Sequence, residues 1–294
     1  MKHPFLPLKS LDNLWFQVSG TLCNLRCHHC FISCSPENDK FDFLTLDQVK
    51  ARLEESRKHG VKEYYFTGGE PFANRQMLEI LEATLAYGPA TVLTNGTLIT
   101  PPIANRLARI SDASLYSLEI RVSIDGFNAG TNDPIRGGGT FVRAIKGVKN
   151  LVEAGLLPII TAMRSWEIQD DETYLAGFRK TLKDIGYDRP RLKLLPSLKL
   201  GAETLRSRGY TDTEMITEEM MAGYDSDQLI CANSRVVTDK GVYVCPILID
   251  SPDARLGNTL EDATTGYGLR HKACYTCWQF GAICSNATAK PREA

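Results

Sequence analysis

The sequence predicts an α/β protein in which parallel strands alternate with helices, followed by a cysteine-rich C-terminal segment. Three observations lead to this fold class. Short apolar runs alternate with helical patterns through the first two thirds of the chain, and polar or glycine-rich strings follow several of these runs. The nine cysteines fall into two groups, one near each end, with about 200 residues between them that contain none.

Six segments have the length and apolar content of buried strands. They cover residues 14–18, 61–66, 90–94, 118–124, 158–163 and 191–196. Helical periodicity separates them. Thr45 and Gln48 form a capping box before a helix that runs to Lys58, with Gly60 just beyond its end. Further helices are predicted at about 75–86, 102–109, 140–154 and 170–185. This alternation indicates parallel βαβ units.

Composition describes an ordinary globular chain. With 294 residues and a formal net charge of −1, the protein has no global field that would attract nucleic acid or an anionic membrane. No stretch approaches the roughly 20 apolar residues of a membrane span, and the N-terminus with its two prolines does not resemble a signal peptide. Nine cysteines in a chain without a leader favour the reducing cytoplasm, and metal binding before disulfides.

The first cysteine group is the most informative feature. Cys23, Cys27 and Cys30 occur in the string CNLRCHHC. Thiolates on one short loop suit an iron–sulfur cluster or zinc. In a 4Fe–4S cluster, three cysteines leave one iron open for another ligand, which favours chemistry over a structural role. Cys34, four residues further on, is expected to be a buried structural thiol.

The spacing C-x3-C-x2-C resembles the signature of the radical SAM superfamily. The resemblance implies that the open iron chelates S-adenosylmethionine (SAM), which is cleaved to a 5′-deoxyadenosyl radical that takes hydrogen from a substrate. It also implies an open, partial (β/α)6 TIM-like barrel, with the active site at the carboxyl ends of the strands. His29 stands where the family often has an aromatic residue. A small zinc site is the alternative for these three cysteines.

The strings at the strand ends match the expected SAM pocket. In TGGEP, Gly68 and Gly69 allow close backbone approach, and by resemblance Glu70 belongs to the motif that holds the SAM amino group. Thr94 ends the third strand and Asn95 follows it. In VSIDG, Ser123 and Asp125 are assigned by resemblance to the ribose or the methionine carboxylate. Plain turns are the alternative in each case.

Two arginines follow these strings. Arg136, in a predicted loop, and Arg143, in the next helix, are candidates for gripping the SAM carboxylate, although a solvated or structural arginine is equally consistent with the sequence. Met163 stands at the end of the fifth strand, where relatives often have asparagine.

The second cysteine group predicts another metal site. The segment VVTDKGVYVC is typical of a hairpin that brings Cys231 and Cys245 to one end of two strands, and CYTC adds Cys274 and Cys277. Four thiolates leave no iron open in a 4Fe–4S cluster. This pattern resembles the Twitch domain, the shortened relative of the SPASM domain, which carries one auxiliary cluster. Cys284 is left over as a substitute ligand, a substrate-side thiol or an inert structural thiol, and zinc is the alternative metal.

The resulting hypothesis is a radical SAM enzyme with a partial barrel at 1–215 and a Twitch/SPASM-like domain at 216–294. About 12 residues precede the first strand, which favours a small metabolite over a leader-dependent peptide as substrate. A flavodoxin- or ferredoxin-type protein is the expected electron donor. The late cysteines and the AKPREA end argue against a GTP cyclase of the molybdopterin pathway. The alternatives are a peptide- or protein-modifying maturase and a non-catalytic iron–sulfur carrier or sensor.

Overall fold

One sheet connects the early and late parts of the chain. A computed structural model describes residues 3–166 and 170–281, and its main sheet has the strand order β10-β9-β8-β2-β3-β4-β5-β6-β7. The six strands β2 to β7 are parallel to one another. They are β2 (Asn13–Gln17), β3 (Glu63–Thr67), β4 (Ala90–Thr94), β5 (Leu118–Ser123), β6 (Ile159–Met163) and β7 (Arg191–Leu195). Within the described residues β10 and β7 form the two edges, so the barrel is open.

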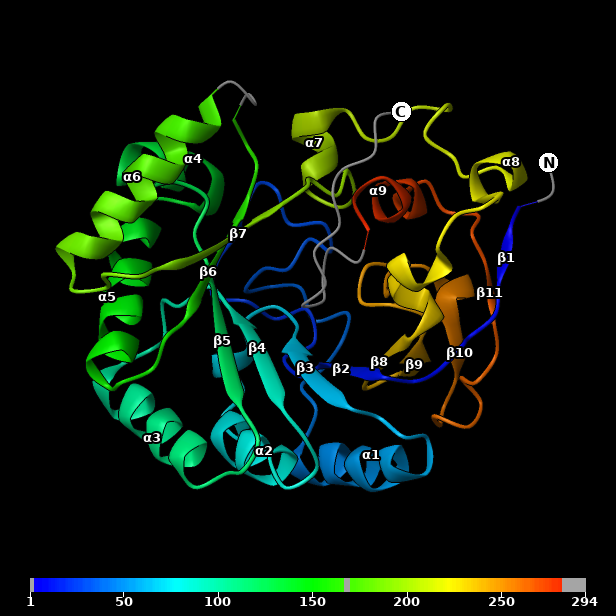
Figure 1. Ribbon diagram of the computed structural model, residues 1–294, viewed down its shortest axis with the longest axis horizontal. Coiled ribbons are helices and arrows are strands. Elements are labelled where there is room, and N and C mark those ends of the chain that lie inside the picture. Colours follow the sequence, from blue (N-terminus) through cyan, green and yellow to red (C-terminus); the bar gives the residue numbers. More distant parts are fainter. Residues whose placement is uncertain (1–2, 167–169, 282–294) are drawn as a thin grey trace.

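Helices cover the outer face of the parallel strands (Figure 1). They are α1 (Leu46–Lys58), α2 (Met77–Thr84), α3 (Pro101–Asp112), α4 (Ala129–Arg136), α5 (Thr140–Glu153) and α6 (Asp171–Asp184). All six predicted strands and the predicted helices between them are present, with ends shifted by a few residues. The capping box of Thr45 and Gln48 is also present.

Helix α4 corrects the prediction of a loop around Arg136. The internal Pro134 removes a backbone donor and is a signal against a helix. The helix forms because Asn128 and Thr131 make a reciprocal capping box at its start. It ends after two turns at Gly137, whose φ of 103° few other residues adopt.

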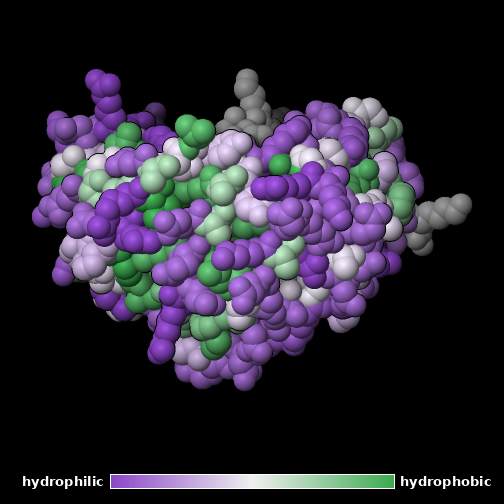
Figure 2. Space-filling view, turned by 90° about the horizontal axis from the view of Figure 1, so that it is seen from below, coloured by the Kyte–Doolittle hydropathy of each residue, from purple (hydrophilic) through white to green (hydrophobic). Residues whose placement is uncertain are grey.

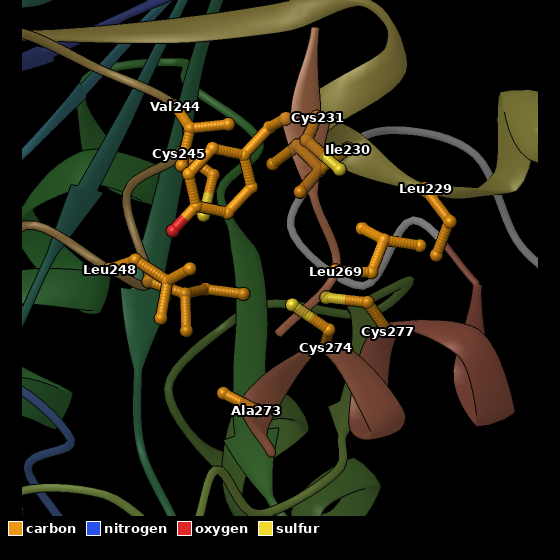
Figure 3. A pocket seen from close by; sticks show the side chains of 12 residues that line it. Leu229, Ile230, Cys231, Val244, Cys245, Leu248, Leu269, Ala273, Cys274 and Cys277 are labelled. Atoms are coloured by element: carbon orange, nitrogen blue, oxygen red, sulfur yellow. The ribbon is translucent and has the colours of Figure 1, made fainter. Parts of the chain in front are cut away.

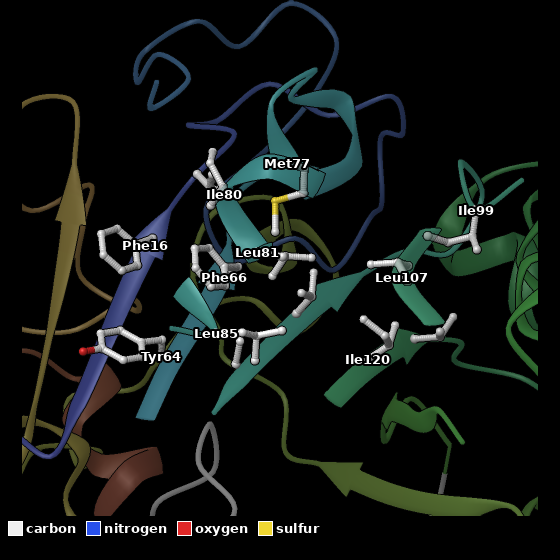
Figure 4. Packing of buried hydrophobic residues seen from close by; sticks show 14 of the residues in the cluster. Phe16, Tyr64, Phe66, Met77, Ile80, Leu81, Leu85, Ile99, Leu107 and Ile120 are labelled. Atoms are coloured by element: carbon white, nitrogen blue, oxygen red, sulfur yellow. The ribbon is translucent and has the colours of Figure 1, made fainter. Parts of the chain in front are cut away.

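Side chains of the strands alternate between two apolar clusters. On β3, Tyr64 and Phe66 join the cluster beneath the outer helices, whereas Tyr65 joins the cluster on the inner face. Figure 4 shows the outer cluster, where Phe66 packs near Leu81 of α2. On the inner face, the rings of Trp15 and Tyr65 stack with centroids 4.3 Å apart. Burial of each such side chain is worth about 1.5–3 kcal/mol, so the alternation fixes which side chains face the barrel interior.

Shorter elements complete the chain beside the barrel. They are β1 (Phe5–Leu6), α7 (Glu203–Ser207), α8 (Glu218–Met221), β8 (Ser234–Thr238), β9 (Gly241–Tyr243), β10 (Arg255–Gly257), β11 (Tyr267–Gly268) and α9 (Ala273–Phe280). The predicted hairpin is confirmed, since Thr238 pairs with Gly241 across a two-residue turn.

The main sheet crosses the predicted domain boundary between residues 215 and 216. Strand β8 lies parallel to β2, with Leu14 opposite Arg235, and β1 pairs with β11 near the other end of the chain. Each of the two predicted domains therefore shares backbone hydrogen bonds with the other. The limits 1–215 and 216–294 stay a prediction.

The face of the molecule formed by α1, α2 and α3 is largely hydrophilic. Figure 2 views the protein from below, the side on which α1, α2 and α3 lie in Figure 1, and hydrophobic residues show mainly between polar ones. No helix in the described ranges is both long enough and apolar enough to cross a membrane.

Candidate functional site

A cavity of about 230 Å³ opens at the carboxyl ends of the parallel strands. Its wall combines the first cysteine group, the strand-end strings and inward-facing side chains of β5 to β7. The predicted site residues that line it are Cys23, Cys27, Cys30, Gly68, Gly69, Thr94, Asn95, Ser123 and Arg136. Strand ends far apart in the sequence thus meet at one place, as expected for a parallel sheet.

Backbone N–H groups point at the cysteine sulfurs. The N–H of Leu25 donates to Cys23 Sγ over 3.4 Å, and the N–H of Cys34 donates to Cys30 Sγ over 3.2 Å. The side-chain amide of Asn95 also approaches Cys23 Sγ at 3.8 Å. Such donors stabilise sulfur in its thiolate form, which is the metal-binding form.

Burial and hydrogen bonds shift the pKa values of these thiols in opposite directions. Burial raises the pKa of Cys23 to about 12 and that of Cys27 to about 11. Hydrogen bonds from Cys34 lower the pKa of Cys30 to about 6. A metal that binds this loop must therefore displace protons from Cys23 and Cys27.

The two glycines of TGGEP fix this strand end against the cysteine loop. A Cβ at Gly69 would overlap the carbonyl of Leu22, and one at Gly68 would overlap the Ser19 hydroxyl. Without side chains, the Gly69 N–H donates to Gly20 O over 3.0 Å and the Glu70 N–H donates to Leu22 O over 3.1 Å. The glycines therefore bring this backbone against the loop that carries the thiols, and both also face the cavity.

Glu70 lies fully buried behind the cavity wall. Its carboxylate accepts hydrogen bonds from the Thr94 hydroxyl at 2.6 Å, the Asn95 N–H at 2.7 Å and the Phe72 N–H at 3.1 Å. Burial raises its pKa, and these donors oppose that rise. The carboxylate predicted to hold the SAM amino group thus fixes the next strand end, Thr94–Asn95, beside the cavity.

Asp125 is also buried, and it lies at the centre of an ionic cluster. Its Oδ2 is 2.6 Å from Arg136 Nε and 2.7 Å from His29 Nε2, and its Oδ1 accepts the Met163 N–H at 2.8 Å. Burial alone would raise the pKa of Asp125, but Arg136 and His29 hold it below its usual range. Arg136 and His29 line the cavity, whereas Asp125 stands behind them.

His29 is a site residue that the sequence did not reveal. Its position between two cysteines suggested only a substitute for an aromatic ring. No local pattern signals this role, because the contact of His29 with Asp125 joins residues far apart in the chain. Arg143, by contrast, is exposed on α5, where its Nε donates to Gly139 O over 3.3 Å, and it does not line the cavity.

Arg121 and Lys193 are further cavity residues that sequence reasoning missed. Arg121 lies on β5, two residues before Ser123, and so faces the same side of the sheet. Lys193 lies on β7 in register with Thr161 of β6, which is itself in register with Ser123. The alternation of side chains along a strand could have identified both residues. In LEIRVSI and RLKLLP, Arg121 and Lys193 occupy positions that face the interior of the barrel.

The second cysteine group lines a separate, almost wholly apolar cavity. Cys231 lies before β8, Cys245 follows β9, and Cys274 and Cys277 lie on α9. Figure 3 shows all four side chains around this cavity among leucines and an isoleucine. Burial raises the pKa of Cys231 to about 12 and that of Cys245 to about 11. Cys284 lies outside the described residues.

Arg235 is a buried cation beside this second cavity. Its guanidinium donates to four backbone carbonyls, those of Cys231, Ser234, Ala263 and Thr265, at 2.5–2.9 Å. No carboxylate of the described residues forms an ion pair with it. Burial lowers the pKa of Arg235 to about 10, while Cys231 and Cys245 oppose this shift. A buried charge without a counter-charge is costly, so this environment favours an anion in the cavity.

The thiols of each group are spread around a cavity wall. Across the described ranges, no three His, Cys, Asp or Glu side chains are arranged so that they could hold a metal ion as the side chains stand. In a 4Fe–4S cluster each cysteine binds a different iron, so the four sulfur ligands stand further apart than the ligands of a single metal ion. Thiols spread around a cavity wall are therefore compatible with a cluster.

Several known proteins resemble this chain. The mycofactocin maturase MftC of Mycolicibacterium smegmatis is 37% identical over 134 residues, which are 45% of this chain and 32% of that protein. The AdoMet-dependent heme synthase of Methanosarcina barkeri is 37% identical over 142 residues, 48% of this chain and 38% of that protein. The matched region thus spans about a third of each relative's length.

Solved structures share the fold at low sequence identity. Native anSMEcpe with bound AdoMet aligns over 85% of this chain and 79% of its own, with a TM-score of 0.62 and 17% identity. Streptococcus suis SuiB bound to the precursor peptide SuiA aligns over 85% and 62%, with a TM-score of 0.63 and 15% identity.

The sequence profile of the radical SAM superfamily matches residues 18–174, which is more than half of the chain. This range begins at the end of β2, contains all three cysteines of the first group and extends into α6. The chain therefore belongs to the radical SAM superfamily.

Proposed function

We propose that this protein is an enzyme that uses a 4Fe–4S cluster at Cys23, Cys27 and Cys30 to cleave SAM and take hydrogen from a substrate. The observation that carries the proposal is the meeting of these three thiols with the glycine backbone of Gly68 and Gly69 in one cavity. When bound, the cluster and SAM supply a 5′-deoxyadenosyl radical. The chain supplies the ligands, the pocket and the exclusion of water.

The residues around the thiols suit a charged, polar ligand such as SAM. The backbone at Gly68 and Gly69 faces the cavity, and Glu70 fixes Thr94 and Asn95 beside it. Ser123 ends β5, the strand next to β4, and its hydroxyl lies 3.3 Å from that of Thr161 on β6. Arg136, held by Asp125, presents a guanidinium at the wall and is our candidate for the SAM carboxylate.

The second cavity supports an auxiliary 4Fe–4S cluster bound by Cys231, Cys245, Cys274 and Cys277. Four thiolates would satisfy all four irons, and the apolar wall would exclude water. The lone buried charge of Arg235 beside the cavity suits an anionic cluster. Such a site is suited to exchanging electrons or to shaping the substrate pocket.

A peptide-modifying maturase is the second candidate function. The mycofactocin maturase is a relative of this chain, and SuiB, which shares its fold, has been solved with a precursor peptide. An enzyme that acts on a small metabolite and a peptide-modifying maturase would cleave SAM in the same way. They would differ only in the substrate that enters the cavity.

The test is a comparison of SAM cleavage in matched variants. Anaerobically reconstituted protein with dithionite and SAM should release 5′-deoxyadenosine slowly without substrate. Cys27→Ala should abolish the release because the thiol set would no longer hold the cluster. Cys34→Ala removes a neighbouring thiol outside the C-x3-C-x2-C spacing but keeps the backbone N–H that donates to Cys30 Sγ, so it should retain the cluster iron. An iron-loaded, reduced wild type that forms no deoxyadenosine would instead support an iron–sulfur carrier.

A further inference from the structure

The loop that carries the first cysteine group, residues 22–35, has an outer side as well as a side that faces the barrel cavity. On the outer side a groove of about 390 Å³ lies between this cysteine loop and α7. Cys27 and Cys34 line both the groove and the barrel cavity. At this place, therefore, only the cysteine loop separates the proposed cluster from the outer surface of the protein.

The start of α7 is held against the cysteine loop by backbone contacts. The N–H of Ala202 donates to Cys30 O over 2.9 Å, and a Cβ at Gly201 would overlap the carbonyl of Phe31. Within the loop, the N–H of His28 donates over 2.8 Å to a backbone carbonyl of α4. These contacts fix the loop and the helix relative to each other, so the groove is formed before any partner arrives.

The groove presents two arginines and an exposed leucine. Arg26 and Arg206 line it, and no aspartate or glutamate of the described residues does so. Leu205, which also lines it, is 91% exposed. A single exposed leucine is ordinary by itself. This one borders a groove beside two arginines, and arginine is enriched in the surfaces through which proteins bind one another.

Both arginines have carboxylate partners, and these partners lie outside the groove lining. Arg206 pairs with Glu203, which is fully buried, so the surface presents the guanidinium and not the carboxylate. Arg26 pairs with Glu37, and both of these side chains are more than half exposed. An ion pair between exposed side chains contributes little to stability, so Arg26 can turn to a carboxylate of a partner at small cost. The lining therefore suits a partner with an acidic surface.

We infer that this groove is the docking site of a small acidic electron-transfer protein that reduces the cluster of the first cysteine group. The inference rests on the proposed function, because reductive cleavage of SAM takes one electron from outside the chain. The donor loses this electron and the cluster gains it, and no bond forms or breaks in this step. Electron transfer slows steeply with distance, and SAM and the substrate would fill the barrel side of the loop. The groove at Cys27 offers the short route.

The experiment compares two electron sources in the reconstituted enzyme. Dithionite is a small inorganic reductant that needs no docking site. The protein donor is an acidic flavodoxin, kept reduced by its NADPH-dependent reductase. Release of 5′-deoxyadenosine is measured with each source. Binding of oxidised flavodoxin to the enzyme is measured separately by biolayer interferometry, which requires no turnover.

Two variants place negative charge in the groove, and each has a matched control. Leu205→Glu is compared with Leu115→Glu, which changes another exposed leucine, located before β5 and so at the opposite end of the parallel strands. Arg26→Glu is compared with Lys180→Glu, which changes another exposed, ion-paired cation, on the outer helix α6. Iron content and circular dichroism confirm that each variant is folded and loaded.

Both groove variants should weaken flavodoxin binding and raise the half-saturating flavodoxin concentration at least ~10-fold, because like charges then oppose each other across the interface. Their dithionite-driven release should equal that of the wild type, and the two controls should match the wild type with both electron sources. Added salt should weaken flavodoxin binding to the wild type, since exposed charges are screened.

Several results would overturn the inference. They are equal flavodoxin dependence in the wild type and both groove variants, binding that salt does not weaken, and a wild type that accepts electrons from dithionite but not from flavodoxin. A loss of dithionite-driven release in the groove variants would also overturn it, because the groove would then support the cluster. If Leu205→Glu instead abolishes a dimer seen by gel filtration and spares flavodoxin binding, a second copy of this chain is the occupant. Absence of deoxyadenosine with either source would contradict the proposed function itself.

Discussion

The two cysteine cavities of this protein differ in almost every physical property. The barrel cavity is larger, contains three predicted ligands, and mixes glycine backbone, hydroxyls and cations with apolar groups. The C-terminal cavity contains four predicted ligands within an apolar wall, and the buried Arg235 donates to the carbonyl of one of them, Cys231. An incomplete ligand set in a polar cavity suits chemistry on a bound molecule. A complete set in an apolar cavity suits electron exchange or structure.

The largest expected effect comes from removing the first ligand set. Two 4Fe–4S clusters predict roughly eight irons per reconstituted chain. Changing Cys23, Cys27 and Cys30 together to alanine should remove about half of the iron and all SAM cleavage. Iron analysis and chromatography of deoxyadenosine measure both quantities. Zinc without iron in anaerobically purified protein would contradict the assignment of both cavities.

The matching change in the other cavity should separate the two roles. A variant lacking Cys274 and Cys277 should lose the other half of the iron but still release deoxyadenosine, because the barrel pocket is built from other elements. Conversion of the true substrate should fail. In the same assay Cys284→Ala tests the leftover thiol, and loss of auxiliary iron would show that our choice of four ligands is wrong.

A single methyl group should disable the first cavity and spare the second. In Gly69→Ala the new Cβ would overlap the carbonyl of Leu22, and overpacking of this kind typically costs about 1–3 kcal/mol. We expect the variant to lose the iron of the first cluster and to retain the auxiliary cluster in its electron paramagnetic resonance spectrum. Gly138→Ala, where nothing lies near the added methyl, is the control. Equal iron in both variants would mean that this backbone contact does not support the loop.

Changing the buried carboxylate should weaken SAM binding without removing iron. Glu70→Gln replaces one accepting oxygen with an amide donor, which then faces either the Asn95 N–H or the donors Thr94 and Phe72. Two buried donors that face each other without an acceptor cost about 1–3 kcal/mol of stability. The strand end at Thr94 and Asn95 should therefore shift, and the affinity for SAM should fall roughly 10-fold. Equilibrium binding of SAM to the reconstituted cluster measures the effect. An unchanged affinity would show that Glu70 supports the fold alone.

The smallest effect concerns the charge beside the second cavity. Arg235→Met should make the auxiliary cluster harder to reduce, because a nearby cation stabilises the more negative state. A shift on the order of tens of millivolts is expected, and redox titration followed by electron paramagnetic resonance measures it. The potential of the first cluster serves as the internal reference. A shift of both potentials, or of neither, would contradict a local electrostatic role.

Local patterns were enough to predict the parallel strands and both cysteine cavities. Each strand of the barrel is a short apolar run with a helix after it, and the polar strings at the strand ends meet because parallel strands end on one side. A hairpin and the CYTC turn predicted the pairs Cys231–Cys245 and Cys274–Cys277, and the resemblance to the Twitch domain predicted that the two pairs share one site.

Long-range partners were not predictable in this way. The pairing of Asp125 with His29 and Arg136 joins three segments whose spacing along the chain gives no sign of contact. Helix α4 is short and contains Pro134, which is a signal against a helix, so its sequence does not stand out from a loop. The parallel pairing of β8 with β2 depends on which edge of the sheet remains available, and local periodicity does not contain that information.

The β2–β8 ladder limits how this protein can be divided in the laboratory. Expressing residues 1–215 and 216–294 as separate pieces would leave β2 without the partner that pairs with Leu14, Trp15 and Phe16. The other piece would expose the apolar edge of β8 in the same way. Unpaired hydrophobic strand edges recruit other chains, so each half should precipitate when made alone. Co-expression of the two halves offers a route by which both could stay in solution.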